Sequence, residues 1–277
     1  MDFLTKLDAA VTKNNSLLCI GLDPNMEMLP EHLQSDPQAY VNFNKAIVDA
    51  TADLVCAYKP NSAFYEARGA QGVEELKATC DYIKSKYPDI PIILDFKRGD
   101  IGSTNDQYSK FAFDYIGADA ITVHPYQGGK ALQAFLDQKD KGIIVWVRSS
   151  NPGGGEFQDL EVNGRKLYLE VADSVVKNWN ANENCLLVVG ATYPDELAEI
   201  RQLAGDNLVF LVPGIGAQGG DVEATVKAGV NSAGRGIIIN SARDIIYASN
   251  GEDFAEAAKV RAQAVRNEIN QYRGVVA

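Results

Sequence analysis

Four charged residues are the strongest candidates for chemistry. Asp95, Lys97 and Asp100 lie in the segment Asp95-Phe-Lys97-Arg-Gly-Asp100, and Lys59 follows an earlier apolar run. A lysine held beside an aspartate offers a fixed positive charge and a proton, which suits electrostatic stabilisation and general acid catalysis. Burying such a cluster is costly unless its charges neutralise one another, so an ion-pair network that merely closes the fold is the alternative interpretation.

A second group of residues, late in the chain, has the features of a phosphate site. Pro213-Gly-Ile-Gly-Ala-Gln218-Gly-Gly offers backbone N–H groups unobstructed by side chains, and a predicted helix begins directly afterwards at Asp221. Gly234-Arg235-Gly236 supplies a planar cation that can bind phosphate through two hydrogen bonds. Tight turns with a surface arginine are the alternative interpretation.

Eight short apolar runs, rich in β-branched residues, must position these side chains. Most are continuously apolar, which is typical of parallel strands buried on both faces. Stretches with helical periodicity lie between them, including Val41–Ala52, Gly128–Gln138, Asp221–Gly229 and Phe254–Tyr272. The apolar runs are Leu17–Gly21, Leu54–Tyr58, Ile92–Asp95, Ala120–Val123, Ile143–Val147, Leu186–Gly190, Leu208–Val212 and Ser232–Gly236.

This alternation of strands and helices predicts an α/β fold with a parallel sheet, and eight repeats predict a single (β/α)8 TIM barrel over residues 1–277. The run Ser232–Gly236 is the weakest of the eight, and without it an open doubly wound sheet is the alternative. The long irregular segment Ser149–Gly164 contains Asn-Pro-Gly-Gly-Gly. Loops of this length in a compact domain are more often functional than not, so we interpret it as a mobile loop after the fifth strand.

The active site of such a barrel is formed by the loops that follow its strands. A single polar residue in such a loop can be explained by contact with solvent at the end of its strand. Polar residues after all eight predicted strands instead predict one shared site. Asp95 and Lys97 are two residues apart, so a persisting strand would point both into the barrel mouth. The residues at the eight strand ends are Asp23, Lys59, Asp95 to Asp100, His124, Arg148 with Ser150, Thr192, Pro213 to Gly220, and Arg235.

The net charge and the numbers of cysteines and histidines argue against several classes of partner and site. The net charge of −11 argues against nucleic acid or an anionic membrane as the main partner, while a local cationic site for a small anion remains compatible with it. No run approaches the length of a membrane span, and the first residues do not follow a signal-peptide pattern. The four cysteines form no Cys-x-x-Cys motif, which favours reduced thiols and a cytoplasmic location. Two histidines give little support to a histidine-rich metal site.

With these motifs in place, the sequence resembles the orotidine 5′-phosphate decarboxylase family, in its type 2 branch. Leu94-Asp95-Phe-Lys97-Arg-Gly-Asp100-Ile101-Gly-Ser-Thr104 matches the family signature Asp-x-Lys-x-x-Asp-Ile-x-x-Thr. Tyr58-Lys59-Pro-Asn-Ser-Ala-Phe-Tyr-Glu66 resembles the second-strand motif of that branch. Asp-x-Lys-x-x-Asp alone is shared with sugar-phosphate enzymes, but Ile101 and Thr104 favour the nucleotide enzyme. The matches run in the expected order from Gly21 to Arg235 and so cover most of the chain.

The resemblance implies a role for each matching residue. Lys97 corresponds to the proton donor to C6 of the pyrimidine, Asp95 to the carboxylate beside the substrate's carboxylate, and Lys59 to the lysine that holds this array and contacts the ribose. Asp100, Ile101 and Thr104 correspond to residues given to the partner subunit's site, which implies a homodimer with shared active sites. The other matches are Asp23 near the ribose hydroxyls, Ser150 or Ser149 at the pyrimidine, Gln218 and Arg235 at the phosphate, and Pro213 and Gly234 within the phosphate-binding segments.

The resemblance also implies the reaction, which converts orotidine 5′-phosphate to uridine 5′-phosphate in the last step of pyrimidine biosynthesis and needs no cofactor. Because the carbon that loses CO2 has no adjacent carbonyl to accept electrons, its carbanionic character must be stabilised electrostatically, and a lysine ammonium can do this and then deliver the proton. Three alternatives stay open at this point: a Mg²⁺-dependent sugar-phosphate lyase of the same barrel group, a Schiff-base aldolase that uses Lys59 or Lys97, and a non-catalytic sensor of phosphate ligands.

Overall fold

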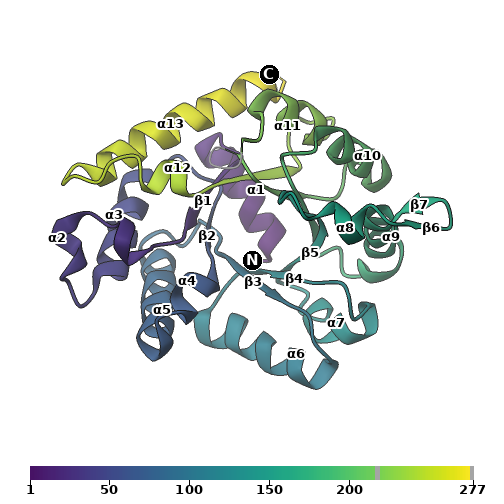
Figure 1. Ribbon diagram of the computed structural model, residues 1–277, viewed down its shortest axis with the longest axis horizontal. Coiled ribbons are helices and arrows are strands. Elements are labelled where there is room, and N and C mark those ends of the chain that lie inside the picture. Colours follow the sequence, from purple (N-terminus) through teal and green to yellow (C-terminus); the bar gives the residue numbers. More distant parts are fainter. Residues whose placement is uncertain (216–218, 275–277) are drawn as a thin grey trace.

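Eight parallel strands form one curled sheet in the computed structural model, which describes residues 1–215 and 219–274 (Figure 1). Their order around the sheet is β2-β1-β10-β9-β8-β5-β4-β3. Bridges between Tyr58 and Ile92, and between Asn61 and Asp95, join β2 to β3 and close the ring. The predicted (β/α)8 barrel is therefore confirmed. The strands are β1 Leu18–Leu22, β2 Ala57–Pro60, β3 Ile93–Arg98, β4 Ala120–Val123, β5 Gly142–Arg148, β8 Cys185–Val189, β9 Phe210–Pro213 and β10 Ile237–Ser241.

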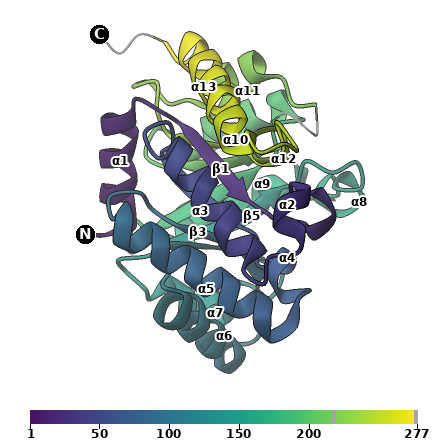
Figure 2. The ribbon, with the colours of Figure 1, turned by 90° about the vertical axis from the view of Figure 1, so that its left-hand side faces the viewer.

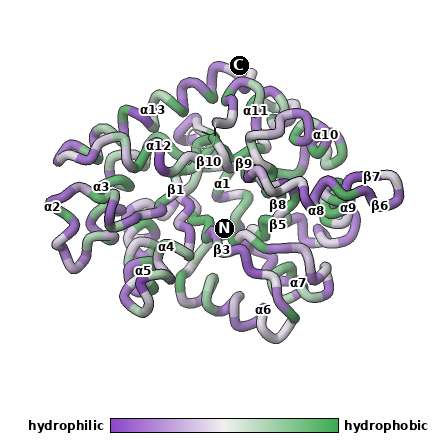
Figure 3. Tube along the Cα trace, viewed as in Figure 1, coloured by the Kyte–Doolittle hydropathy of each residue, from purple (hydrophilic) through white to green (hydrophobic). Residues whose placement is uncertain are grey.

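The helices surround the sheet (Figure 3). They shield its outer face, which is why most of the strands are buried along their whole length. All four cysteines are buried and unpaired. Among the described residues, no helix combines the length and apolar character needed to cross a membrane. The longer helices are α3 Ala39–Thr51, α5 Gly69–Lys86, α6 Gly102–Ser109, α7 Gly129–Leu136, α9 Leu167–Ser174, α10 Pro194–Ala204, α11 Val222–Gly229 and α13 Phe254–Tyr272; α6 and α9 continue as π-helices over Lys110–Ile116 and Val175–Trp179.

The first helix, α1 (Phe3–Asn14), packs against the amino ends of the strands. Asp2 caps it by accepting a hydrogen bond from the Thr5 N–H, and Lys6 forms an ion pair of 2.9 Å with Asp119, directly before β4. Figure 2 shows α1 on the opposite side of the barrel from the short helices α2 (Glu31–Gln34) and α8 (Gly155–Gln158). The carboxyl ends of the strands are thus left for a site.

The eighth strand begins later than the sequence analysis predicted. Ser232–Gly236, predicted as a strand, is a turn in which Gly234 and Gly236 have φ angles of 65° and 82°. The side chain of Asn231 accepts hydrogen bonds from the N–H groups of Ala233 and Arg235, which fixes the turn. The strand itself is the apolar run that follows, β10, so the residues at its carboxyl end also differ from those predicted.

The long segment after β5 is partly ordered by local structure. It contains α8 and the start of a small hairpin, β6 (Glu161–Val162) and β7 (Arg165–Lys166). Arg148, at the end of β5, is 2% exposed and lies 3.3 Å from Asp159 and 3.5 Å from Glu196. The buried guanidinium thereby ties this loop to the barrel.

Candidate active site

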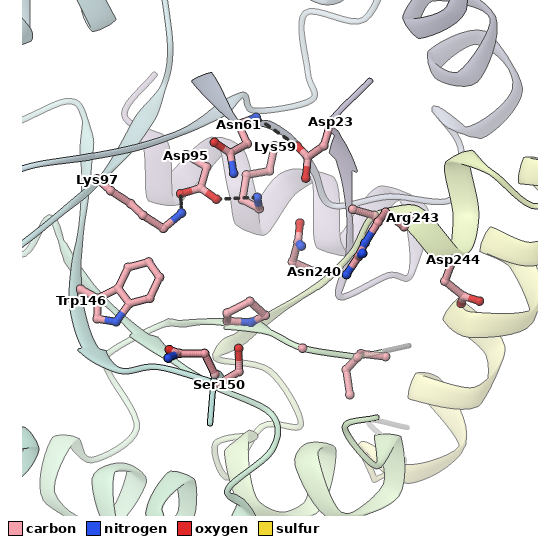
Figure 4. Close-up of a pocket in the computed structure, with 15 residues that line it drawn as sticks. Asp23, Lys59, Asn61, Asp95, Lys97, Trp146, Ser150, Asn240, Arg243 and Asp244 are labelled. Atoms are coloured by element: carbon pink, nitrogen blue, oxygen red, sulfur yellow. Dashed lines mark hydrogen bonds and ion pairs between the residues drawn. The ribbon is translucent and has the colours of Figure 1, made fainter. Parts of the chain in front are cut away.

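A cavity of about 310 Å³ opens at the carboxyl ends of the strands (Figure 4). It lies where the sequence analysis placed the site. A row of charged residues lines one side, and a tryptophan, polar groups and an arginine line the rest. The first side is formed by Asp23, Lys59, Asn61, Asp95 and Lys97, and the others include Trp146, Ser150, Pro213, Gly214, Ile215, Asn240 and Arg243.

The carboxylate of Asp95 is shared between two lysine ammonium groups. Lys59 Nζ lies 2.9 Å from Oδ2, while Lys97 Nζ contacts Oδ1 of the same carboxylate (Figure 4). The side chain of Lys59 is 4% exposed and that of Asp95 is 11% exposed, so both charges are held away from water. Asp23 lies beside this group and accepts a hydrogen bond of 3.1 Å from the Asn61 N–H. The two lysines and two aspartates together carry no net charge, which lowers the electrostatic cost of burying them.

The two lysines respond to this environment in opposite directions. Burial lowers the pKa of Lys97, and the ammonium of Lys59 lowers it further, so that Asp95 only partly restores it. Burial acts on Lys59 in the same sense, but the carboxylates of Asp95 and Asp23 outweigh it and raise the pKa of Lys59. Burial would raise the pKa of Asp95, yet the two ammonium groups hold that pKa below its ordinary value. Lys97 is therefore the more readily deprotonated lysine, beside a carboxylate that stays ionised.

Lys97 reaches this position through a bulge and not through regular strand alternation. Its φ angle is 48°, which is unusual for a residue with a side chain. The register between β3 and β4 shifts between Leu94 and Arg98, so the expectation that strand geometry persists through Asp95 and Lys97 is wrong. The two side chains still meet, because the bulge turns Lys97 back towards Asp95.

Trp146 forms an aromatic wall that the sequence analysis missed. Lys97 Nζ lies 4.9 Å from the centre of its ring system, and the ring of His124 stacks on it at 5.3 Å. Its signal in the sequence is weak, because Trp146 is one aromatic residue within the otherwise aliphatic run of β5. The ring gives the cavity a flat apolar surface beside the Lys97 ammonium.

Ser150 and Pro213 both line the cavity, as predicted. Of the two candidate serines, Ser150 lines the cavity, whereas the hydroxyl of Ser149 is hydrogen-bonded to Gln158 Oε1 at 3.1 Å and Ser149 is buried, so the geometry favours Ser150. The hydroxyl of Thr192 donates a hydrogen bond of 3.1 Å to the Ser150 carbonyl and helps to fix this residue. Gln218 lies outside the described residues.

Asp100, Ile101 and Thr104 do not line this chain's cavity. Asp100 is exposed and accepts a hydrogen bond from the Ile101 N–H, and Ile101 is 58% exposed in front of α6. Thr104 is half-buried in the first turn of that helix. An exposed isoleucine followed by polar residues at a helix start forms a surface and not a pocket.

Gly234 and Arg235 lie at the wrong end of the barrel for the predicted phosphate role. Because β10 begins after them, they stand at its amino end, where Arg235 Nη1 contacts Asp8 at 2.5 Å and Thr12 at 3.1 Å. Both of these partners belong to α1. The prediction that Arg235 and Gly234 contact a phosphate is therefore wrong, and its cause is the misplaced eighth strand.

Arg243 occupies the position that Arg235 was expected to fill. It follows β10 as the first residue of α12 (Arg243–Ile246) and extends into the cavity towards Asn240, at the opposite end from Lys97 (Figure 4). Asn240 is 8% exposed, and its Oδ1 accepts no hydrogen bond from the described part of the chain. The signal for both residues was present in the sequence as Ile237-Ile-Ile-Asn-Ser-Ala-Arg243, an apolar run followed by polar residues.

Within residues 1–215 and 219–274, no group of three or more His, Cys, Asp or Glu side chains is arranged to hold a metal ion.

An eight-stranded barrel with paired lysines around one carboxylate and an arginine across the cavity defines a TIM-barrel protein equipped for a small anionic ligand. The sequence model of the orotidine 5′-phosphate decarboxylase / HUMPS family matches residues 16–258. The chain belongs to this family.

Individual relatives agree with this. The chain is 54% identical to an orotidine 5′-phosphate decarboxylase from Azoarcus sp. (strain BH72) over 99% of its length and 100% of the relative's. Among solved structures it is similar to Leishmania donovani OMP decarboxylase, with a TM-score of 0.85, 38% identity and 99% of both chains covered. It also matches Leishmania donovani UMP synthase with a TM-score of 0.86 and 39% identity, covering 98% of this chain and 57% of that one.

The charge array generates a prediction on stability. Burial raises the pKa of Asp23, and the ammonium of Lys59 offsets only part of this rise, to which the carboxylate of Asp95 adds a smaller amount. When the pKa of a carboxyl is higher in the folded protein than its unfolded value of about 3.9, the folded state becomes less stable as the pH rises from the unfolded pKa to the folded one. Asp23→Asn, which keeps the acceptor for Asn61, should therefore be more stable than the parent protein at pH 7, and the difference should vanish below about pH 4.

Urea unfolding of both proteins at the two pH values measures this difference. Asp36→Asn is the matched control, since hydrogen bonds from Gln38 and Asn42 lower the pKa of Asp36 and reverse the expected sign. An Asp23→Asn protein less stable than the parent at pH 7 contradicts the electrostatic description of the site.

Proposed function

We propose that this chain decarboxylates orotidine 5′-phosphate to uridine 5′-phosphate, as a carbon–carbon lyase in the last step of pyrimidine biosynthesis. The observation that carries the proposal is the Asp95 carboxylate held between Lys59 and Lys97 in the cavity. The names of relatives that match over their full length support it. The cavity also offers a cation at each end for an elongated anionic nucleotide.

The cavity suggests how the nucleotide would lie. The pyrimidine would occupy the end near Lys97, beside the flat ring of Trp146 and within reach of Ser150. The phosphate would lie at the other end, near Gly214 and Arg243, where the guanidinium favours an anion. The ribose would then pass Asp23, Lys59 and Asn61, whose polar groups can bind its hydroxyls.

In this orientation the carboxylate of the substrate faces Asp95. Two like charges about 4 Å apart at an effective dielectric constant of about 20 repel one another by about 4 kcal/mol, and loss of CO2 relieves this repulsion. The ammonium of Lys97 stabilises the charge that develops at C6 and then donates the proton there. Its lowered pKa helps this step, because a weaker hold on the proton brings the donor closer to working pH.

The phosphate acts at a distance from the reacting carbon. Its contacts with Arg243 supply binding energy that orients the pyrimidine against Lys97 and helps to exclude water. The long loop after β5 would contribute through Ser150, which Arg148 holds in place by tying the loop to the barrel.

Lys97→Ala tests the proposed reaction. Removing the proton donor and its charge should lower kcat for CO2 release by at least about 10⁴-fold, while uridine 5′-phosphate still binds. Lys130→Ala, on the exposed surface of α7, is the control and should retain full activity. If Lys97→Ala released CO2 at a rate within tenfold of the parent (about 1.4 kcal/mol in the activation barrier), the assignment of Lys97 as the proton donor would be refuted.

A pair of arginine variants tests the orientation of the nucleotide. Arg243→Ala should raise KM by about 10- to 100-fold, since a charge-assisted contact with phosphate is worth about 1.5–3 kcal/mol. Arg235→Ala removes the ion pair with Asp8 and the hydrogen bond to Thr12, both outside the cavity, and should leave KM unchanged, with a loss of about 1 kcal/mol in the free energy of unfolding. A large KM effect at Arg235 and none at Arg243 would reverse the placement of the phosphate.

We also propose a homodimer in which Asp100, Ile101 and Thr104 complete the partner's site. The proposal is supported by their exposure beside the barrel mouth and by their match to the family signature. Mixing Lys97→Ala with Asp100→Ala under conditions that exchange subunits should then restore activity to about a quarter of the parent value, because half of the dimers regain one intact site. A mixture as inactive as its two components refutes sharing.

A cytoplasmic location belongs to the same proposal. It is supported by the four buried, unpaired thiols, which suit a reducing compartment.

A further inference from the structure

The hydroxyl of Thr122 lies beneath the Asp95–Lys97 bulge and contacts it three times. Thr122 belongs to β4, is 1% exposed and does not line the cavity. Its Oγ1 lies 2.9 Å from Asp95 Oδ1, 2.9 Å from the Phe96 N and 3.0 Å from the Lys97 N. All three contacts go to one short segment of the neighbouring strand.

The direction of each hydrogen bond follows from the chemistry of the groups. The two backbone N–H groups can only donate, so the hydroxyl oxygen accepts from both. Its single proton is then free to be donated to the carboxylate of Asp95. A hydroxyl has one proton to donate and two lone pairs with which to accept, so the hydrogen-bonding capacity of Thr122 is fully used.

The register of the sheet explains why these groups need a side-chain partner. Leu94 pairs with Ile121 and Arg98 pairs with Val123, so Asp95, Phe96 and Lys97 all face the single residue Thr122. Three residues cannot make regular ladder hydrogen bonds with one, and the N–H groups in the bulge lose their usual carbonyl partners. The Thr122 hydroxyl replaces those partners and supports Lys97 at its φ angle of 48°.

We propose that Thr122 is a positioning residue, whose hydroxyl holds both the backbone of the bulge and the Asp95 carboxylate so that Lys97 points at the reacting carbon. This inference rests on the proposed decarboxylation. It adds a residue that the motif Asp-x-Lys-x-x-Asp does not contain, contributed by a different strand. Lys59 holds Asp95 Oδ2, so Thr122 and Lys97 on Oδ1 leave the carboxylate no freedom to rotate.

An aliphatic residue of the same shape would leave this arrangement incomplete. Thr122→Val removes one hydrogen-bond donor and two acceptor sites. It leaves the buried N–H groups of Phe96 and Lys97 without their hydrogen-bond acceptor. Thr122→Ser keeps the hydroxyl and removes only a methyl group. The two variants therefore separate the hydrogen bonds from the packing.

The test measures kcat and KM for CO2 release from orotidine 5′-phosphate. Thr122→Val should lower kcat by roughly 10- to 100-fold, the effect of losing one buried hydrogen bond to a charged group, with KM changed less than threefold. Thr122→Ser should stay within about threefold of the parent in kcat. A merely structural residue would affect thermal unfolding in the Val variant without this split between kcat and KM.

A valine variant with the parent kcat, or a serine variant as impaired as the valine one, overturns the proposal. If Thr122→Val fails to fold, Thr122→Cys takes its place, because a thiol fills the same space and is a poor hydrogen-bond partner. It should show the same loss of kcat, and a parent-like kcat overturns the proposal in the same way.

A crystal structure of the folded variant separates this inference from the proposed function, since it needs no turnover. The proposal expects the Asp95 carboxylate to rotate away from its two lysines or Lys97 to leave the left-handed region. An unchanged arrangement of Asp95, Lys97 and Lys59 overturns the positioning role even if the parent protein releases no CO2.

Discussion

The ion pairs that Asp95 forms with Lys59 and Lys97 are the interaction on which the rest of the site depends. Lys59 is almost completely buried, and a buried ammonium is tolerated only beside a compensating carboxylate. The barrel closes between β2 and β3, so the strands that carry these residues are neighbours, and the bridge from Asn61 to Asp95 joins them at the level of the charges. The closure of the barrel and the assembly of the charge array are thus one structural event.

The fold separates its two ends by function. At the amino ends of the strands, α1 forms ion pairs through Lys6 and Asp8, and these contacts stabilise the barrel. At the carboxyl ends, the cavity sets Lys97 and Trp146 opposite Arg243, so a reacting group and a phosphate can be held at once (Figure 4). Arg235 and Arg243 are eight positions apart in the sequence, yet β10 carries one to each end.

Much of this arrangement could be predicted from the sequence, for physical reasons. Continuous apolar runs identify parallel strands, and in a parallel barrel the residues after each run must meet at one end, which located Asp23, Lys59, Asp95 and Ser150. The prediction is wrong at the eighth strand, because it places the strand at Ser232–Gly236, whereas the apolar run that forms the strand begins at Ile237. That single shift exchanged Arg243 for Arg235.

Other features are not encoded in local patterns. The bulge at Lys97 depends on the register between β3 and β4, and Thr122 acquires its role only when the strands are side by side. The same holds for Trp146, which packs against Lys97 from a strand about fifty residues later in the chain. The sequence can name the ionisable groups of a site, whereas the groups that aim them come from tertiary contacts.

The most direct measurement of the central claim is the loss of orotidine 5′-phosphate absorbance on adding the purified protein, with and without EDTA. We expect steady loss of absorbance at the same rate in both samples, since Lys97 and Asp95 provide the charges that the reaction needs. No loss of absorbance, or a loss that stops with EDTA and returns with Mg²⁺, would contradict it and favour a metal-dependent sugar-phosphate enzyme on the same barrel.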